Sequence, residues 1–287
     1  MTEAPLALSV APSSGPRGRL LIACLAVSVL ASVVCLEFVW PTLLGQRPPL
    51  IWNDFLFALV HYASLGTLLM YPLSRHGDDF LRLFTASRPD HAAIRWAVTT
   101  GAASVGVSVA SLFAVFIPLS YLSPGFVQEW LIDPATPIIW TSGDSYMWAN
   151  IANFLLVALL APVVEETFFR GLLLPAWSRR FGPMRAMIWS SLFFAVFHPD
   201  IVGSFIGGVV LALVFLKTRT LWLPIVMHVT HNTLAWTYEA GELVFFGESQ
   251  YTLADFQATW WIGLAGFLVG VPLLVRALRR MPVPLAS

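Results

Sequence analysis

Long runs of mostly apolar residues are the feature that most constrains the fold of this chain. Eight such runs occur, at about residues 20–40, 52–73, 96–121, 146–173, 186–199, 201–216, 221–238 and 258–275. About 20 helical residues cross the hydrocarbon core of a bilayer, so runs of this kind predict transmembrane helices. Only 11% of the residues are charged, whereas soluble domains carry roughly 25%. The sequence therefore predicts an all-α fold, a polytopic transmembrane helical bundle of about eight spans.

Basic residues indicate how these spans are oriented. Of the 16 Lys and Arg residues, 15 lie in the terminal segments, in alternate connections between the runs or, for Arg170, at the end of the fourth run. The exception is Arg47. Connections rich in Lys and Arg stay on the cytoplasmic side of a membrane. Eight spans with both termini in the cytoplasm satisfy this rule. Acidic residues such as Glu129, Asp144 and Glu242 then fall on the opposite side.

The chain divides into four predicted regions. Residues 1–19 form a Pro-, Ser- and Ala-rich cytoplasmic tail with the composition of a disordered segment. Residues 20–145 form an N-terminal transmembrane region of about three spans, and residues 146–238 form a core that carries the intramembrane polar side chains. Residues 239–287 supply an external loop, the last span and a basic cytoplasmic tail. Net charge is zero, and no basic patch interleaved with aromatic residues indicates nucleic-acid binding.

Two adjacent carboxylates lie inside the fourth run. No charged side chain separates Asp144 from Glu165 and Glu166. An ionised carboxylate in the membrane costs at least about 2.5 kcal/mol, so it needs a partner or a function. Arg170 stands four residues after Glu166, on the same helical face, where the two can form an ion pair. Glu165 points elsewhere and is free to act as a general base; a purely structural ion-pair network is the alternative.

Polar side chains in two later spans reach a similar depth. His198 precedes Pro199, whose missing amide hydrogen predicts a break in the helix, and broken helices at membrane depth line protein-enclosed cavities. His228 and Asn232 share a helical face at a spacing of four residues. At helical rise, these side chains and Glu165 lie roughly 10–18 Å from the cytoplasmic ends of their spans. We expect them to meet in one cavity.

A carboxylate and a histidine can together deprotonate water, while a second histidine and an amide donate hydrogen bonds to a developing oxyanion. Such a set is typical of a hydrolase, and a peptide bond is its natural substrate. No serine or cysteine lies in a recognisable nucleophile motif. The sequence therefore favours attack by water.

Three short motifs follow one another in the apolar spans of this region. They are Glu165-Glu166-x-x-x-Arg170, Phe194-x-x-x-His198 and His228-x-x-x-Asn232. In order and spacing they resemble the motifs of the CPBP family of intramembrane glutamic endopeptidases. This is the CaaX-protease and bacteriocin-processing group that includes the eukaryotic Ras-converting enzyme. The resemblance covers about residues 146–238 and implies a protease acting on membrane-bound or lipidated peptides and proteins. The cytoplasmic (inner) membrane of a bacterium is its expected location.

The resemblance also implies a role for each motif residue. Glu165 corresponds to the catalytic glutamate, and His198 helps it to activate water. His228 and Asn232 correspond to the pair that stabilises the oxyanion. The supporting members of the first motif are Glu166 and Arg170.

Alternative functions remain open at this point. No cofactor is expected, but the family was long classed as metal-dependent, so a zinc ion held by Glu165, His198, His228 and His231 is a second interpretation. A non-catalytic membrane interaction or immunity protein would keep the cavity only for binding. A proton-coupled carrier ranks last, because no paired half-sequences indicate the inverted repeats of many carriers.

Overall fold

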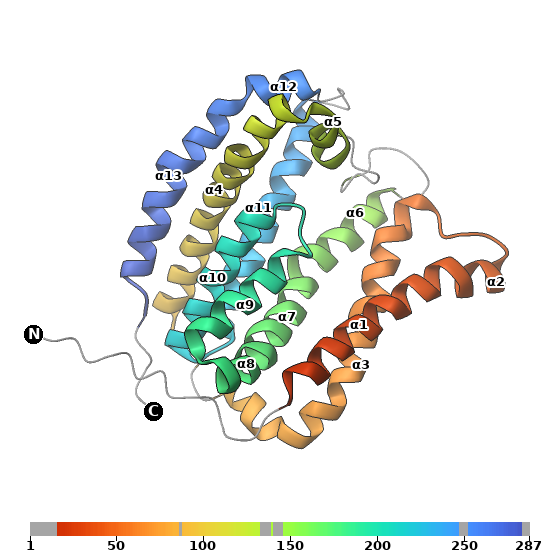
Figure 1. Ribbon diagram of the computed structural model, residues 1–287, viewed down its shortest axis with the longest axis vertical. Coiled ribbons are helices and arrows are strands. Elements are labelled where there is room, and N and C mark those ends of the chain that lie inside the picture. Colours follow the sequence, from red (N-terminus) through yellow and green to blue (C-terminus); the bar gives the residue numbers. More distant parts are fainter. Residues whose placement is uncertain (1–15, 86–87, 133–138, 140–145, 247–251, 283–287) are drawn as a thin grey trace, which may run out of the picture.

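A computed structural model describes residues 16–85, 88–132, 139, 146–246 and 252–282. Those residues form helices and short connections, and no strand occurs among them, which confirms the all-α prediction. The predicted disordered tail lies outside the described residues as far as residue 15. In chain order the helices are α1 (Gly18–Val34), α2 (Trp40–Leu44), α3 (Leu50–Thr85), α4 (His91–Leu122), α5 (Pro124–Val127), α6 (Tyr146–Phe154), α7 (Ala161–Glu166), α8 (Leu174–Phe181), α9 (Pro183–Ala195), α10 (Ile201–Thr218), α11 (Trp222–Phe246), α12 (Leu253–Ala258) and α13 (Trp260–Arg279) (Figure 1).

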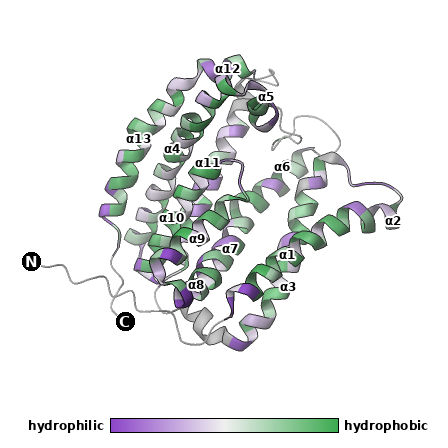
Figure 2. Cartoon of the chain, viewed as in Figure 1, coloured by the Kyte–Doolittle hydropathy of each residue, from purple (hydrophilic) through white to green (hydrophobic). Residues whose placement is uncertain are grey.

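Six helical stretches are long and apolar enough to cross a membrane. They are Gly18–Leu44, Ile51–Arg75, His91–Leu122, Tyr146–Phe181, Ile201–Thr218 and Trp260–Arg279. These stretches indicate an integral membrane protein, and Figure 2 shows hydrophobic residues along much of the helices. The other two predicted spans correspond to α9, which has only 13 residues, and to α11, which carries polar side chains in its apolar sequence. The total of eight spans therefore stays a prediction.

The longest candidate span is one continuous helix from Tyr146 to Phe181. Two π-helical segments, η3 (Leu155–Leu160) and η4 (Thr167–Leu173), alternate in it with α6, α7 and α8. Each π-helical segment ends two residues before a proline, Pro162 or Pro175. Proline has no amide hydrogen and its ring crowds the preceding turn, so the backbone locally adopts a wider turn. This helix carries Glu165 and Glu166 between its two irregular segments.

Two groups of helices surround the continuous helix Tyr146–Phe181, which we call the site helix because it carries Glu165 and Glu166. On one side α4, α10, α11 and α13 pack around a core that includes Ala97, Val214, Met227 and Leu274. On the other side α1 and α3 pack mainly on each other. Leu65 and Leu69 of α3 reach the site helix through a cluster that includes Phe168.

The helices α4 and α13 approach each other at glycines. A Cβ atom added to Gly270 would lie 2.7 Å from the backbone carbon of Gly106, and one added to Gly266 would lie 2.7 Å from the Gly106 carbonyl oxygen. Only the absence of a side chain allows backbones to come this close. The glycines therefore set the distance between these two membrane helices.

Segments rich in basic residues gather at one end of the bundle. Arg179 of α8 donates a hydrogen bond to the Pro16 carbonyl, and the Leu221 amide donates to the Leu83 carbonyl. One apolar cluster at this end joins residues of α3, α8, α9, α10 and α11. In Figure 1 the ends of α8 and α13 lie on this same side of the molecule.

Candidate active site

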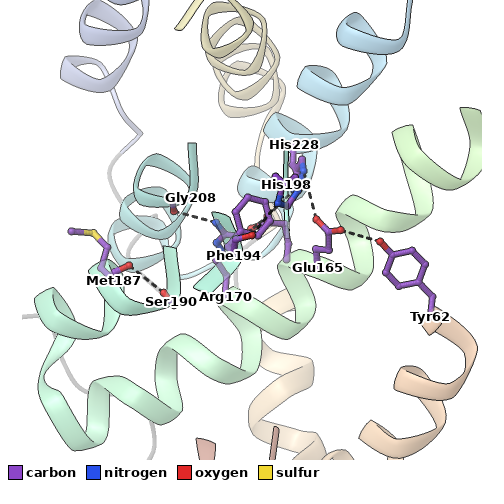
Figure 3. A network of polar contacts seen from close by, with 10 residues as sticks. Tyr62, Glu165, Arg170, Met187, Ser190, Phe194, His198, Gly208 and His228 are labelled. Carbon is purple, nitrogen blue, oxygen red and sulfur yellow. Dashed lines mark hydrogen bonds and ion pairs between the residues drawn. The ribbon is translucent and has the colours of Figure 1, made fainter. Parts of the chain in front are cut away.

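Glu165 lies at the centre of the site, on α7, between side chains of α3 and α11 (Figure 3). The Tyr62 hydroxyl donates a 2.9 Å hydrogen bond to Glu165 Oε1. Glu165 Oε2 lies 3.9 Å from His228 Nε2. The Glu165 side chain is 20% exposed, yet its Oε2 atom is buried and accepts no hydrogen bond from the described residues. An unsatisfied buried carboxylate oxygen beside an imidazole is a position at which a water could bind.

Glu166 points away from Glu165 and organises the opposite side of the imidazole. Its Oε1 atom accepts hydrogen bonds from Arg170 Nη1 at 2.8 Å and from His228 Nδ1 at 2.9 Å. Glu166, Arg170 and His228 are 0%, 1% and 6% exposed. The predicted ion pair between Glu166 and Arg170 is confirmed. Because a carboxylate beside an arginine acts as an acceptor, Nδ1 of His228 carries the hydrogen and Nε2 faces Glu165.

Arg170 is held by more than its carboxylate partner. Its Nη2 atom donates to the Gly208 carbonyl of α10 at 3.1 Å, and its guanidinium lies 4.7 Å from the centre of the Phe194 ring. Arginine suits such a site because its planar group forms hydrogen bonds at its edge while stacking on an aromatic face. Arg170 therefore joins η4 to α9 and α10 inside the bundle.

His198 lies where α9 has ended. The helix stops at Ala195 and α10 begins at Ile201, which confirms the break predicted at Pro199. His198 Nδ1 donates to the Phe194 carbonyl at 2.9 Å, so Nε2 is its remaining nitrogen. The Phe194 ring packs on both imidazoles, 4.3 Å from His198 and 5.8 Å from His228, between ring centres. Among the described contacts, the histidine next to Glu165 is therefore His228. His198 packs on the ring of Phe194 instead.

Asn232 and His231 face different neighbours of α11. Asn232 Nδ2 donates to the Val157 carbonyl of η3 at 2.9 Å, on the helix that carries Glu165. His231 Nδ1 lies 2.8 Å from Ser104 Oγ on α4. The helical spacing that puts His228 and Asn232 on one face turns His231 towards α4. Asn232 therefore joins α11 to the helix that carries Glu165, whereas His231 contributes to the packing of α4 on α11.

A zinc site would require the side chains of its four proposed ligands to converge on one point. Within the described ranges, no three His, Cys, Asp or Glu side chains converge closely enough to hold a metal ion. The set of Glu165, His198, His228 and His231 forms no such group, and the Nδ1 atom of His231 contacts Ser104 instead. Tetrahedral zinc needs ligand atoms within about 2.0–2.3 Å of one point. The residues present do not fit the ion in this arrangement.

Tyr62 is the site residue that was not predicted from the sequence. It lies on α3, and 103 positions separate it from Glu165. In the sequence it is one of two tyrosines in the apolar run at residues 52–73, and tyrosine is common in membrane helices. No motif links it to the three segments that carry the predicted site.

Comparison with known proteins gave one finding. Residues 147–234 match a family model described as type II CAAX prenyl endopeptidase Rce1-like. All six predicted catalytic or supporting residues lie inside the matched region, and Tyr62 lies outside it. The match agrees with the family that the three motifs resemble. No match was found among curated proteins or among solved structures.

Proposed function

We propose that this chain, which carries an Rce1-like peptidase domain at residues 147–234, is an intramembrane endopeptidase in which Glu165 activates water. One observation carries the proposal. The buried Oε2 atom of Glu165 is without a hydrogen-bond donor among the described residues and faces the Nε2 atom of His228 at 3.9 Å. A water oxygen at about 2.8 Å from each of the two atoms would be within hydrogen-bond distance of both. The carboxylate would be the base that accepts its proton.

The proposed reaction is a direct hydrolysis. Glu165 takes a proton from water as the water oxygen bonds to the carbonyl carbon of the scissile peptide. The carbonyl oxygen becomes an oxyanion, which hydrogen-bond donors in the site stabilise. The tetrahedral intermediate then releases the amine as the carbon–nitrogen bond breaks, and the proton on Glu165 passes to the leaving nitrogen. No covalent acyl-enzyme is required.

The histidines have two possible assignments in this scheme. The motif resemblance gives the water-activating role to His198 and the oxyanion to His228 and Asn232. The 3.9 Å contact with Glu165 instead favours His228 as the imidazole next to the base. His198 in its protonated form, in which Nε2 donates as well as Nδ1, and the second amide hydrogen of Asn232 would then serve the oxyanion. We propose this second assignment.

The substrate class follows from the position of the site. Glu165 lies within an apolar helical stretch, so the scissile bond has to reach it from the membrane. We propose membrane-bound or lipidated peptides and proteins as substrates. The description of the matched family, a CAAX prenyl endopeptidase, makes a farnesylated C-terminal peptide the first probe.

We further propose eight spans with cytoplasmic termini in a bacterial inner membrane, with residues 146–238 as the catalytic core. Support comes from the gathering of basic segments at one end of the bundle. The two spans beyond the six candidates would be α9, which ends three residues before His198, and α11, which bears His228. Polar residues such as His228 and Asn232 lower the hydropathy of α11, and α9 is short, with 13 residues.

The direct test is a cleavage assay with purified full-length protein in liposomes and a quenched fluorescent farnesylated CaaX peptide. Glu165→Gln keeps the shape of the side chain and removes the base, so we expect a loss of at least about 100-fold in rate. Glu37→Gln is the matched control, since Glu37 lies in another apolar helix and pairs at the surface with Arg47. Cleavage retained by the Glu165 variant would refute the proposal.

A further inference from the structure

Tyr62 is a candidate for a second functional element, because it reaches Glu165 from outside the Rce1-like domain. Its hydroxyl donates to Glu165 Oε1, while Oε2 of the same carboxylate faces His228 (Figure 3). The two oxygens of one planar group are thus assigned to two different neighbours. A donor fixed on Oε1 restricts rotation of the carboxylate and keeps Oε2 directed to the imidazole.

The position of Tyr62 is itself fixed by the neighbours of α3. Leu65 and Leu69 follow at spacings of three and seven residues, on the same helical face, and are 2% and 3% exposed in the cluster with Phe168 of the site helix. The preceding residue, His61, lies with Nδ1 3.1 Å from Ser28 Oγ of α1. Ser28 is fully buried. The Tyr62 hydroxyl is therefore presented by a helix that is anchored on both sides.

We propose that Tyr62 is a positioning residue for the general base: it orients the Glu165 carboxylate so that Oε2 meets the attacking water. This inference rests on the proposed function. It extends the catalytic unit beyond residues 147–234 and gives α3 a role in the reaction. The alternative is that the hydrogen bond only fastens α3 to α7.

Kinetics of Tyr62→Phe separate these two roles. The variant keeps the aromatic ring and removes one hydroxyl. We expect kcat to fall about 10- to 100-fold, the loss that follows removal of a hydrogen bond to an ionised group, with KM changed less than about twofold. Tyr71→Phe is the matched control, because Tyr71 lies on the same helix and is exposed. The contact described for its ring is with the Arg75 guanidinium. It should match the wild type in both constants.

A spectroscopic measurement reports on the carboxylate directly. The infrared carboxylate stretch that disappears in Glu165→Gln should shift in Tyr62→Phe and stay in place in Tyr71→Phe, because hydrogen bonding to a carboxylate oxygen changes its stretching frequency. Thermal stability is measured on the same samples. A purely structural role predicts a lower melting temperature with kcat unchanged for the folded fraction, and that result would overturn the inference.

The two proposals fail in different ways. If the wild type cleaves the farnesylated peptide, Glu165→Gln does not, and Tyr62→Phe equals the wild type in kcat and in the infrared band, then only the role of Tyr62 is wrong. If Glu165→Gln cleaves as well as the wild type, the base assignment fails, and the positioning role falls with it.

Discussion

At the scale of single residues, five polar side chains form one series of contacts through the apolar part of the chain. In order of contact they are Arg170, Glu166, His228, Glu165 and Tyr62. The series alternates hydrogen-bond donors with carboxylates, so each ionisable group has a partner of complementary character. Two carboxylate oxygens of the series, Oε2 of Glu165 and Oε2 of Glu166, are left without a donor among the described residues. Of the two, Oε2 of Glu165 faces Nε2 of His228, where a bound water would join the series.

Replacing each histidine by glutamine tests which imidazole works with Glu165. Glutamine can donate a hydrogen bond but cannot exchange a proton at neutral pH. We expect His228→Gln to lower kcat about 100-fold or more, since it loses proton exchange beside the base. His198→Gln should lose less, because a donor to the oxyanion is retained. Steady-state kinetics on the farnesylated peptide measure both, and the reverse order would return the water-activating role to His198.

The site could be predicted from the sequence where it depends on local spacing. The Glu166–Arg170 pair follows from a separation of four residues on one helix, and it is present. Depth along a span brought Glu165 and His228 into one region, and they do lie in contact. Depth does not determine how a helix is rotated about its axis, so the contact of His231 with Ser104 could not be foreseen. Tyr62 required knowledge of which helix packs beside α7.

At the scale of helices, proline accounts for both the predicted and the unpredicted irregularities. Pro199 predicted the break between α9 and α10, and Asp200 then caps α10 by accepting a hydrogen bond from the Gly203 amide. The π-helical segments before Pro162 and Pro175 were not predicted. A proline inside a membrane helix can be accommodated by a kink, a break or a wider turn, and packing selects among them. Such segments often occur at functional sites, as η3 and η4 do beside Glu165.

The close approach of α4 and α13 predicts a strong response to the smallest side chain. In Gly270→Ala the new Cβ atom would lie 2.7 Å from backbone carbon of Gly106, and backbone cannot move aside as a flexible side chain can. We expect the free energy of unfolding to fall by about 1–3 kcal/mol. Gly207→Ala on α10 is the control, since its Cβ would meet no atom within 4 Å. Unfolding in mixed micelles by titration with a denaturing detergent measures both, and equal stabilities would contradict the packing.

At the scale of the whole molecule, the number of spans depends on whether two further helices, α9 and α11, cross the membrane. Length and hydropathy select six stretches and leave out α9 and α11. The site residue His228 lies on α11, and His198 follows the end of α9. In the bundle α9 packs mainly against α8 and α10, and α11 packs mainly against α4. A helix shielded by other helices can span with a less apolar sequence than one that faces lipid. Hydropathy therefore predicts the fold class better than it predicts the span count.

The proposed topology is tested by cysteine labelling. In a variant with Cys24 and Cys35 replaced by alanine, single cysteines are placed at Arg180 and Ala254, both exposed and at opposite ends of the bundle. A membrane-impermeant maleimide added to intact bacterial spheroplasts should label Ala254→Cys and spare Arg180→Cys. Inside-out vesicles should give the reverse pattern. Labelling of both positions from one side would exclude the proposed orientation.

The measurement closest to the central claim is made in the membrane of the native cell. The chromosomal gene is replaced by the wild type, by Glu165→Gln or by Glu37→Gln, and the newly formed ends of membrane proteins are compared by mass spectrometry. The account predicts a set of protein ends that is present with the wild type and with Glu37→Gln and absent with Glu165→Gln, at equal amounts of protein. The same ends appearing with Glu165→Gln would contradict it.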